Sequence, residues 1–447
     1  MQEAIAHLEL QLNDPDLRVR AAALGELVRL AEGGAIALPP QADLANMHCH
    51  TFFSFNAWGL SPSALAWHAR QRGLQLAGIV DFDVLDGVDE FLAACDAVGL
   101  RGSAGIETRL YLPEYAAREV NSPGEPGIAY HMGIGFTSGR VPADVAPILA
   151  TLRDRAAARN REMVRRINAH LAPVTVEYDR DVVPLTPAGN ATERHIVSAY
   201  LRAAADQPDP AGFWAARLGL PHGEVAAALA DAPRLQNLVR SRLMKRGGVG
   251  YVPPSPEAFP TAGELHRLVT ACGALPCLAW LDGTSQGEAN AEELIAFWVE
   301  RGVVAVNIIP DRNWNIADPA QRRLKVARLH EFVRVAQAHA LPLNVGTEMN
   351  APGQKWVDDF DAPELAPLRQ AFLDGAYFVY GHTALQRACG LGYGSPWAAA
   401  HLPGRAERVA FYAQVGRLLL PGRAGLAKLG RIEAGIEPRD VLARLRR

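Results

Sequence analysis

The sequence lacks the features that mark membrane proteins, secreted proteins and nucleotide-loop enzymes. No stretch reaches the length of about 18 consecutive apolar residues that a membrane-spanning helix needs. The opening stretch, MQEAIAHLELQLNDPDLRVR, carries acidic side chains and no apolar run typical of a secretory signal. No GxxxxGKS/T motif is present, and no GxGxxG motif leads from a predicted strand into a helix. We therefore expect neither a membrane span nor a glycine-rich phosphate loop.

Cysteine is scarce and scattered. The 447 residues include only five cysteines, an odd number with no CxxC pair. This pattern argues against a disulfide framework and against a cysteine-rich zinc site. It favours a reducing compartment, so we expect a cytoplasmic protein.

An excess of one charge is also absent. The 45 Lys and Arg residues are balanced by 48 Asp and Glu residues, which gives a formal net charge of −3. Proteins that bind nucleic acids or anionic membranes usually carry strongly basic surfaces, and single-strand binders interleave basic and aromatic residues. We therefore expect a small-molecule substrate, with no nucleic-acid partner and no membrane partner.

Short apolar runs alternate with amphipathic stretches over much of the chain. The apolar runs predict seven strands, at 43–50, 74–82, 100–108, 129–136, 274–282, 303–310 and 342–350. The amphipathic stretches predict helices at 61–73, 86–99, 291–302 and 320–340. Buried strands that alternate with helices are typical of parallel βα units. The predicted fold is α/β, a distorted seven-stranded TIM-like barrel.

Three segments fall outside this alternation and divide the chain. Residues 1–40 predict an N-terminal helical extension, and 140–260 are rich in helical pattern and arginine. We interpret the second segment as a helical insertion subdomain over one mouth of the barrel, which separates a first barrel part from a second. The predicted divisions are 1–40, 41–139, 140–260, 261–375 and a C-terminal helical region at 376–447.

The strongest chemical signal is His48-Cys49-His50 at the end of the first predicted strand. Side chains alternate along a strand, so the two histidines share a face and Cys49 points the other way. Further imidazoles and carboxylates stand on other predicted strands, whose ends would open on the same mouth of a parallel barrel. The predicted metal-site residues are His48, His50, Glu107, His131 and Glu348. This set, without a thiolate, suits Zn²⁺, Mn²⁺ or Fe²⁺.

The first three motifs resemble a known family. The stretch NMHCHTFFSFNAWGLSPSALAWHARQRGLQLAGIVDFDVLDGVDEF, followed by GIE, resembles the PHP (polymerase and histidinol phosphatase) family, with its HxHTxxSxD, TDHDxxxG, GIE and late GSDxH motifs. The resemblance covers 43–136 and 262–350. It implies a distorted seven-stranded barrel that hydrolyses phosphoesters with one to three metals. RNREMVRRINAHL and ATERHIVSAYL also resemble the helical insertion of its small-molecule phosphoesterase branch.

The resemblance implies which residues bind each metal. The first metal is assigned to His48, His50, Glu107 and Glu348, and Glu107 bridges to a second metal that His131 also binds. Several expected ligands are replaced, at Asn56, Phe82, Asn350 and Trp280. A phenyl ring cannot coordinate a metal, and a neutral amide is a weak ligand. We therefore expect one firm divalent metal, possible weak occupancy of a second site with Asp282 as substitute ligand, and no third.

Cations and histidines outside the metal set are candidates for the remaining roles. Arginine can clamp a phosphate through two hydrogen bonds, which compensates for a lost metal. The predicted substrate-binding residues are Arg194, His195, Arg312 and Lys355. The predicted proton-transfer residues are His131 and His382. The predicted function is a phosphoesterase that hydrolyses a small phosphorylated molecule through a metal-activated water.

Two other functions stay open at this point. The same barrel and metal suit hydrolysis of a C–N or ester bond, because carbonyl chemistry needs only one or two metals. The third hypothesis is a non-catalytic protein that binds a metal or ligand in the pocket. The retained ligand set at several strand ends favours an enzyme over this last alternative.

Metal stoichiometry tests the assignment of the replaced ligands. After gentle purification and re-addition of Zn²⁺ or Mn²⁺, we expect one tightly held ion per chain and at most a weaker second ion. A third ion at Phe82 would be buried against a phenyl ring without ligands, at a desolvation cost of many kcal/mol. Elemental analysis by mass spectrometry measures the ratio, and a value near three ions per chain would contradict the alignment.

Overall fold

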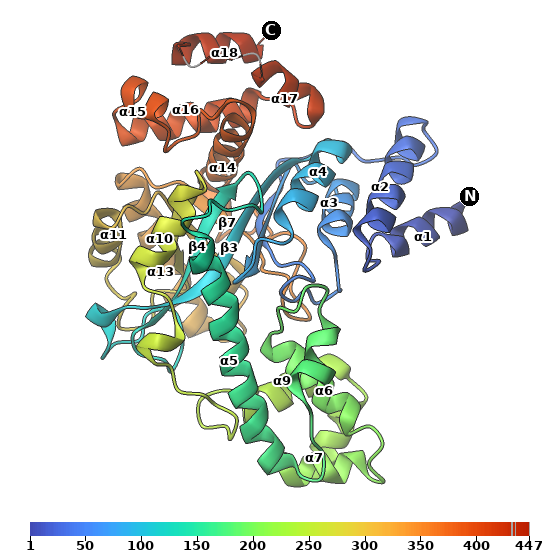
Figure 1. The fold of residues 1–447 in the computed structure, drawn as a ribbon. Helices are drawn as coiled ribbons and strands as arrows, with labels where there is room; N and C mark the ends of the chain where they lie inside the picture. Colours follow the sequence, from blue (N-terminus) through green and yellow to red (C-terminus); the bar gives the residue numbers. More distant parts are fainter. Residues whose placement is uncertain (431, 434, 447) are drawn as a thin grey trace.

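The computed structural model describes residues 1–430, 432–433 and 435–446 (Figure 1). In this part of the chain one seven-stranded sheet runs in the order β1-β2-β3-β4-β5-β6-β7. The sheet curls until its two edges meet, where a parallel bridge joins Cys49 to Glu348 and the amide of His50 donates to the carbonyl of Glu348 at 2.7 Å. The predicted α/β fold, a distorted TIM-like barrel, is confirmed.

Each predicted apolar run coincides with one strand, although β3 and β4 extend beyond the predicted bounds. The strands are β1 (Ala45–Cys49), β2 (Leu76–Phe82), β3 (Arg101–Tyr111), β4 (Ile128–Phe136), β5 (Leu275–Trp280), β6 (Ala305–Ile308) and β7 (Leu343–Val345). They are almost entirely buried on both faces, which explains why the sequence shows continuous apolar runs rather than alternation.

One strand departs from the predicted parallel arrangement. β4 runs antiparallel to both β3 and β5, while the other neighbours pair in parallel. Residues 112–127, between β3 and β4, form only a short 3₁₀ turn (η1, Pro113–Tyr115) and no crossover helix. Without that helix the chain returns directly alongside β3 in the opposite direction. The start of β4, not its end, therefore lies at the mouth where the other strands end.

Helices cover the outside of the barrel. Those connecting the strands are α3 (Pro62–Gln71), α4 (Val88–Val98), α10 (Ala262–Ala271), α11 (Ala291–Glu300), α12 (Asp311–Trp314) and α13 (Pro319–Ala338). Side-chain caps fix where several begin: Ser61 accepts from the amide of Ala64, and Asn290 from that of Glu293.

The N-terminal extension consists of α1 (Gln2–Gln11) and α2 (Leu17–Glu32). A buried ion pair docks it on α4: Nε of Arg20 lies 2.8 Å from Oε1 of Glu90, and Nη2 lies 2.5 Å from Oε2. Arg20 also donates to the carbonyls of Asp14 and Pro15, so its charge is fully satisfied. The extension is therefore an integral part of the barrel wall.

The insertion forms a second small unit on one long helix. Its helices are α5 (Ala146–Leu171), α6 (Glu193–Ala203), α7 (Pro210–Leu218), α8 (His222–Leu229) and α9 (Ala232–Leu243), with shorter turns η2 (Tyr178–Val182), η3 (Val183–Leu185) and η4 (Pro256–Ala258). Leu152 of α5 belongs to the barrel core, whereas Ile167 of the same helix belongs to a separate insertion core with Tyr200 and Trp214. α5 therefore carries the insertion outward from the barrel (Figure 1).

The C-terminal helices close the opposite end of the barrel (Figure 1). They are α14 (Arg369–Cys389), α15 (Pro396–His401), α16 (Arg405–Leu418), α17 (Arg423–Leu429) and α18 (Pro438–Arg446), preceded by η5 (Ala366–Leu368). α14 packs so closely on β7 that a Cβ at Gly375 would collide with the backbone of Leu343. The predicted boundary between 375 and 376 falls inside this helix.

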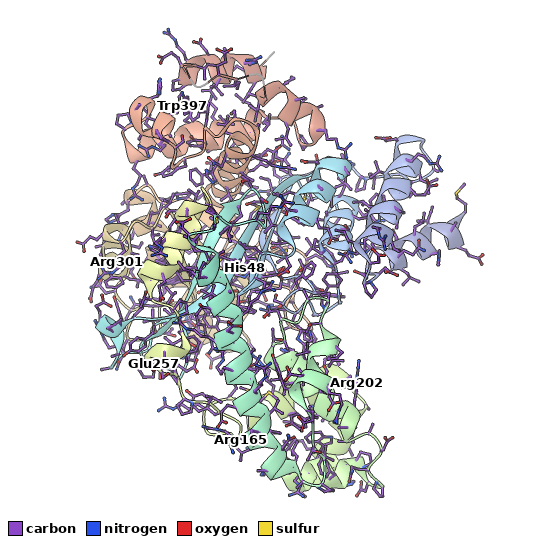
Figure 2. All side chains as sticks on the ribbon, viewed as in Figure 1. His48, Arg165, Arg202, Glu257, Arg301 and Trp397 are labelled. Atoms are coloured by element: carbon purple, nitrogen blue, oxygen red, sulfur yellow. The ribbon has the colours of Figure 1, made fainter. Side chains whose placement is uncertain are left out.

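His48 lies near the middle of the molecule, between the insertion with Arg165 and Arg202 and the C-terminal helices with Trp397 (Figure 2). Among the described residues, no helix is both long enough and apolar enough to cross a bilayer.

Candidate metal centre

Two histidines and one glutamate converge at the mouth of the barrel. Nε2 of His48 lies 3.4 Å from Nε2 of His50. Oε2 of Glu107, from β3, lies 3.3 Å and 3.1 Å from these two nitrogens. All three side chains are buried. The predicted alternation on β1 therefore brings the histidines to one point, and register with β2 and β3 brings the glutamate to them.

This group fits a divalent cation. Oε2 of Glu107 is buried without a hydrogen-bond partner, which is costly for a carboxylate oxygen. Its ligand atom and those of His48 and His50 lie within 4.8 Å of one another. Two imidazole nitrogens and one carboxylate oxygen make up the protein ligands of many catalytic zinc sites, which keep a further position open.

The charges of the three groups favour a cation at the same point. Burial alone would lower the pKa of His48, but the Glu107 carboxylate raises it above its usual value. Burial alone would raise the pKa of Glu107, but His48 and His50 lower it to about 2. Glu107 is therefore ionised at neutral pH and presents its negative charge to the two imidazoles.

Glu348 lies beside this group. Its amide donates to the carbonyl of His48 at 2.7 Å, and its backbone adopts a left-handed conformation with φ 66°. Its Oε2 accepts from Nη2 of Arg312 at 2.8 Å and from Nε2 of Gln354 at 2.9 Å. Burial opposes ionisation, but Arg312 and His48 lower the pKa of Glu348 below its usual value. Glu348 is thus an ionised neighbour of the centre, and its direct ligation stays a prediction.

His131 does not reach this centre, contrary to the sequence prediction. On β4 it is Tyr130 that lines the pocket, and His131 points to the other face. There its ring stacks on Trp298 at 4.3 Å, and its Nε2 lies 2.8 Å from Nε2 of His266. Burial lowers the pKa of His131 well below its usual value. The side chain is an uncharged part of the packing between β4 and the outer helices, so it cannot join Glu107 as a ligand of a second metal.

His382 also lies far from the barrel mouth, where its predicted role in proton transfer would place it. It lies on α14 at the closed end of the barrel, where Nδ1 accepts from the amide of Tyr393 at 2.9 Å. A Cβ at Gly135 would press directly on its ring. Burial lowers the pKa of His382 to about 4. The histidine joins α14 to the barrel base, and a role in proton transfer at the mouth is inconsistent with this position.

The predicted substrate-binding residues divide into two pairs. Arg194 and Arg312 line the pocket. His195 instead caps its own helix, with Nδ1 accepting from the amide of Thr192 at 3.1 Å. Lys355 forms an ion pair with Asp311 at 3.1 Å. Neither His195 nor Lys355 is among the described residues that line the pocket.

The replaced ligand positions serve structural purposes. Asn56 binds three backbone groups, donating to the carbonyl of His50 and accepting from the amides of Trp58 and Leu60. The Phe82 ring stacks on His50 at 4.3 Å. Trp280 stacks on Phe332 of α13 at 4.4 Å, and Asp282, the predicted substitute ligand, pairs with Lys325 of the same helix at 2.7 Å. Asp282 is therefore not available as a substitute ligand, and three of the replaced positions, Phe82, Trp280 and Asn350, line the pocket.

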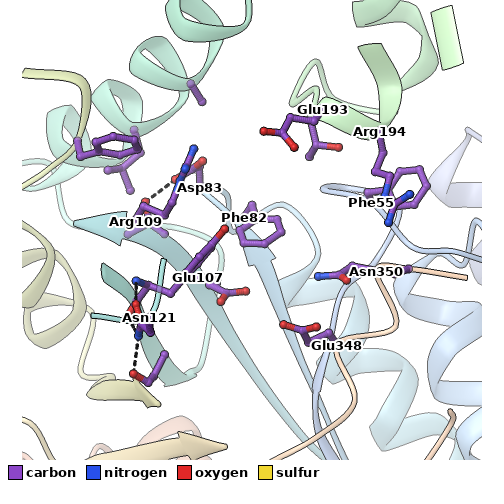
Figure 3. Close-up of a pocket in the computed structure, with 18 of the residues that line it drawn as sticks. Phe55, Phe82, Asp83, Glu107, Arg109, Asn121, Glu193, Arg194, Glu348 and Asn350 are labelled. Carbon is purple, nitrogen blue, oxygen red and sulfur yellow. Dashed lines mark hydrogen bonds between the residues drawn. The ribbon is translucent and has the colours of Figure 1, made fainter. Parts of the chain in front are cut away.

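The pocket beside the centre has a volume of about 380 Å³ and lies between the barrel and the insertion. Figure 3 shows the Glu107 and Glu348 carboxylates near Phe82, with Arg194 and Glu193 approaching from the insertion. Among the described residues, the cations that line it are Arg109, Arg155, Arg159, Arg194, Arg240, Lys245 and Arg312. Most of them were not identified from the sequence. The available signal was the spacing of Arg155 and Arg159, four positions apart within the predicted helical insertion.

Several of these cations have no carboxylate partner. Arg240 and Lys245 both pair with Glu193 at 2.7 Å. In contrast, no ion pair to Arg155 or Arg159 is found within the described part of the chain. Burial, together with the nearby Arg109 guanidinium, lowers the pKa of Arg159 to about 10. The carboxylates of Asp83, Glu193 and Glu125 offset part of the positive charge near Arg159, but the pocket is lined by more arginines and lysines than carboxylates.

Comparisons with known proteins do not assign the chain to a family. No family model and no curated protein matches it. A structure of an amidohydrolase from Chromobacterium violaceum, with bound sulfate and no metal, is 17% identical over 73% of this chain and 96% of that chain, with a TM-score of 0.48. A proposed metal-dependent phosphoesterase from Bifidobacterium adolescentis is 20% identical over 74% and 97%, with a TM-score of 0.47. The PHP resemblance therefore stays a prediction.

Two substitutions separate the structural assignment from the sequence prediction. Glu107→Gln removes the negative charge from the centre and should weaken Zn²⁺ binding by more than about 100-fold, since outer-shell changes alone cost roughly 10–100-fold. His131→Gln should leave Zn²⁺ affinity within about twofold of the wild type, because the ring lies outside the pocket. Isothermal titration calorimetry measures both affinities. Equal losses in the two variants would restore His131 to the metal set.

Proposed function

We propose that the protein is a metal-dependent hydrolase, and more specifically a phosphoesterase that acts on a small phosphorylated molecule. The observation that carries this proposal is the meeting, in one pocket, of a buried His48–His50–Glu107 group and an excess of arginine and lysine side chains. The first feature suits a catalytic metal, and the second suits a strongly anionic substrate.

The residues present would hold one divalent ion, with Zn²⁺, Mn²⁺ and Fe²⁺ as candidates. His48, His50 and Glu107 supply the ligand atoms, and Glu348 is the candidate for a fourth. Such an ion supplies Lewis-acid polarisation of a phosphoryl oxygen and lowers the pKa of a water molecule.

Arg312 is positioned to bind the phosphoryl group next to this centre. Its guanidinium lies 2.8 Å from Glu348, so it is held at the edge of the metal group. The Glu348 carboxylate raises the pKa of Arg312, so its charge persists at any working pH. A guanidinium can form paired hydrogen bonds to two phosphate oxygens and stabilise the charge that develops on them.

The insertion supplies the opposite wall. Arg155, Arg159 and Arg194 come from α5 and α6 and face the barrel mouth across the pocket. Burial lowers the pKa of Arg194 to about 10, and repulsion from the nearby Arg240 guanidinium adds to this shift. An anionic substrate relieves this repulsion, and its entry displaces water from the space between barrel and insertion.

The same cations favour phosphate over carbonyl chemistry. An amide or a carboxylic ester carries no charge at its scissile group, so it gains little from several guanidinium groups. A phosphoester keeps at least one negative charge in the ground state and spreads charge over its equatorial oxygens in the transition state. Hydrolysis of C–N or carboxylic ester bonds is therefore the alternative outcome of the test and not the leading proposal.

A paired substrate panel tests the function. The protein, reconstituted in turn with Zn²⁺, Mn²⁺ and Fe²⁺, is assayed against small phosphomonoesters and against carboxylic esters and amides of matched leaving groups. We expect metal-dependent phosphate release from at least one phosphoester. Turnover confined to esters or amides would support the alternative, and an inactive protein that binds metal tightly would support a binding role.

The role of Arg312 gives a kinetic prediction. Arg312→Gln should lower kcat/KM for a phosphoester by roughly 10–100-fold, because a charge-assisted hydrogen bond contributes about 1.5–3 kcal/mol. Phosphate release is measured at fixed metal loading. The matched control is Arg328→Gln, since Arg328 forms only a surface ion pair with Glu331. A loss of the same size in both variants would remove Arg312 from the site.

The insertion wall gives a second kinetic prediction. Arg159→Met should raise KM by roughly tenfold and change kcat little, since Arg159 attracts substrate but lies across the pocket from the metal group. The control is Arg161→Met on the same helix, whose side chain pairs with Asp179. Initial-rate kinetics distinguish the two effects. An unchanged KM would show that Arg159 does not bind the substrate.

A further inference from the structure

Nδ1 of His50 is the ring nitrogen that points away from the metal centre. It belongs to a chain of hydrogen bonds that starts at a backbone amide. The amide of Thr51 donates to Oδ1 of Asp81 at 2.7 Å, so this oxygen is an acceptor. Oγ of Ser54 lies 2.6 Å from the same oxygen and must therefore donate its hydrogen to it. Nδ1 of His50 lies 3.0 Å from Oγ of Ser54, whose hydrogen is already used. Nδ1 consequently carries the proton of the ring.

The protonation of Nδ1 of His48, which also points away from the metal centre, is determined by a second chain of hydrogen bonds. This chain starts at a backbone carbonyl. The carbonyl of Met47 can only accept, so the side-chain nitrogen of Asn344 faces it at 3.2 Å. The same nitrogen donates to Oδ1 of Asn307 at 2.9 Å, which identifies that atom as an oxygen. Nδ1 of His48 lies 3.1 Å from this oxygen and must donate to it. The neutral His48 ring therefore also carries its proton on Nδ1.

Both chains have the same consequence at the centre. With Nδ1 protonated, the Nε2 atoms of neutral His48 and His50 present bare lone pairs to Oε2 of Glu107. The opposite tautomer would place an N–H bond at the point where a cation is bound. We infer that Ser54 and Asn307 are positioning residues that hold the two imidazoles in the metal-binding tautomer; this inference rests on the proposed metal centre.

The residues of both chains are shielded from water. Ser54 is completely buried, and Asp81, Asn307 and Asn344 are each at most 2% exposed. Water therefore does not compete for their hydrogen bonds, and a lost bond is not replaced. The Asp81 carboxylate also accepts from the Thr51 hydroxyl at 2.6 Å, so three donors hold it in place. The two chains thus hold the imidazoles rigidly as well as fixing their protons.

Zn²⁺ affinity of paired variants tests the inference. Ser54→Ala and Asn307→Leu each remove one acceptor for an Nδ1 proton, and each should weaken Zn²⁺ binding by roughly 10–100-fold. Asn307→Asp keeps an oxygen at the acceptor position and should bind Zn²⁺ within about threefold of the wild type. Competition with a chromophoric chelator measures the affinities, and circular dichroism verifies that each variant is folded.

Matched controls come from buried polar residues away from the centre. Ser63 donates to Oε1 of Glu90 at 2.8 Å, which reproduces the serine–carboxylate bond outside the site. Asn313 is completely buried and donates to two backbone carbonyls. Ser63→Ala and Asn313→Leu should leave Zn²⁺ affinity unchanged. Equal losses in controls and test variants would mean that general destabilisation, and not imidazole positioning, lowers the affinity, and would overturn the inference.

A spectroscopic measurement reads the tautomers directly. In zinc-loaded protein with ¹⁵N-labelled histidine, the resonances missing from His48→Gln and His50→Gln identify the two rings. We expect both rings to carry a proton on Nδ1 and to bind zinc through Nε2. Coordination through Nδ1 in either ring would overturn the inference, even if the affinities changed as expected.

The outcomes separate this inference from the proposed function. If the wild type binds Zn²⁺ and the Ser54 and Asn307 variants bind it equally well, the inference fails and the hydrolase proposal stands. If the variants lose affinity but no phosphoester, ester or amide is hydrolysed, the inference stands and the proposed function fails. A wild-type protein that binds neither Zn²⁺ nor Mn²⁺ would overturn both.

Discussion

The meeting of β1 and β7 is the constraint on which the rest of the site depends. Backbone hydrogen bonds exchanged between His48, His50 and Glu348 close the barrel at this point. The Asn46 side chain reinforces the closure by donating to the hydroxyl of Thr347 at 2.8 Å. A Cβ at Gly346 would collide with Asn46 and with the backbone of His48, so only glycine permits this approach. The contacts that close the barrel thus also set the positions of two imidazoles and a neighbouring carboxylate.

Local pattern was sufficient to predict the seven strands and the shared face of His48 and His50. Both follow from properties of short segments, namely apolar runs and the alternation of side chains along a strand. The direction of β4 does not follow in this way, because it depends on the path of residues 112–127 relative to β3. The sequence shows adjacent candidates, Tyr130 and His131, but not which one faces the pocket. Metal chemistry favours the imidazole of His131, whereas the structure places the phenol of Tyr130 at the pocket.

The cluster of arginines and lysines that lines the pocket was harder to predict, for a different reason. Arg155 and Arg159 lie on an amphipathic helix with many arginines, and in sequence they look like an ordinary solvated helix face. Their neighbours in the pocket, such as Arg109 and Arg240, come from β3 and α9, far apart in the chain. Such a cluster exists only after the insertion has folded back over the barrel mouth. The hydrogen-bond chains behind the histidines are similarly non-local, since Asn307 lies 259 positions from His48.

The charged side chains of the site form two halves of opposite sign, and each half is stabilised by a ligand of the opposite charge. Glu107 and Glu348 gather negative charge on the barrel side, and the insertion gathers positive charge with too few partners. Burial disfavours the charged forms in both halves, and each half gains a favourable interaction from a ligand of the opposite sign. Arg312 links them, because it binds Glu348 and also faces the pocket. A site built in this way gains most when a cation and an anion are bound side by side, and the proposed pairing of a metal ion with a phosphoryl group would meet both requirements at once.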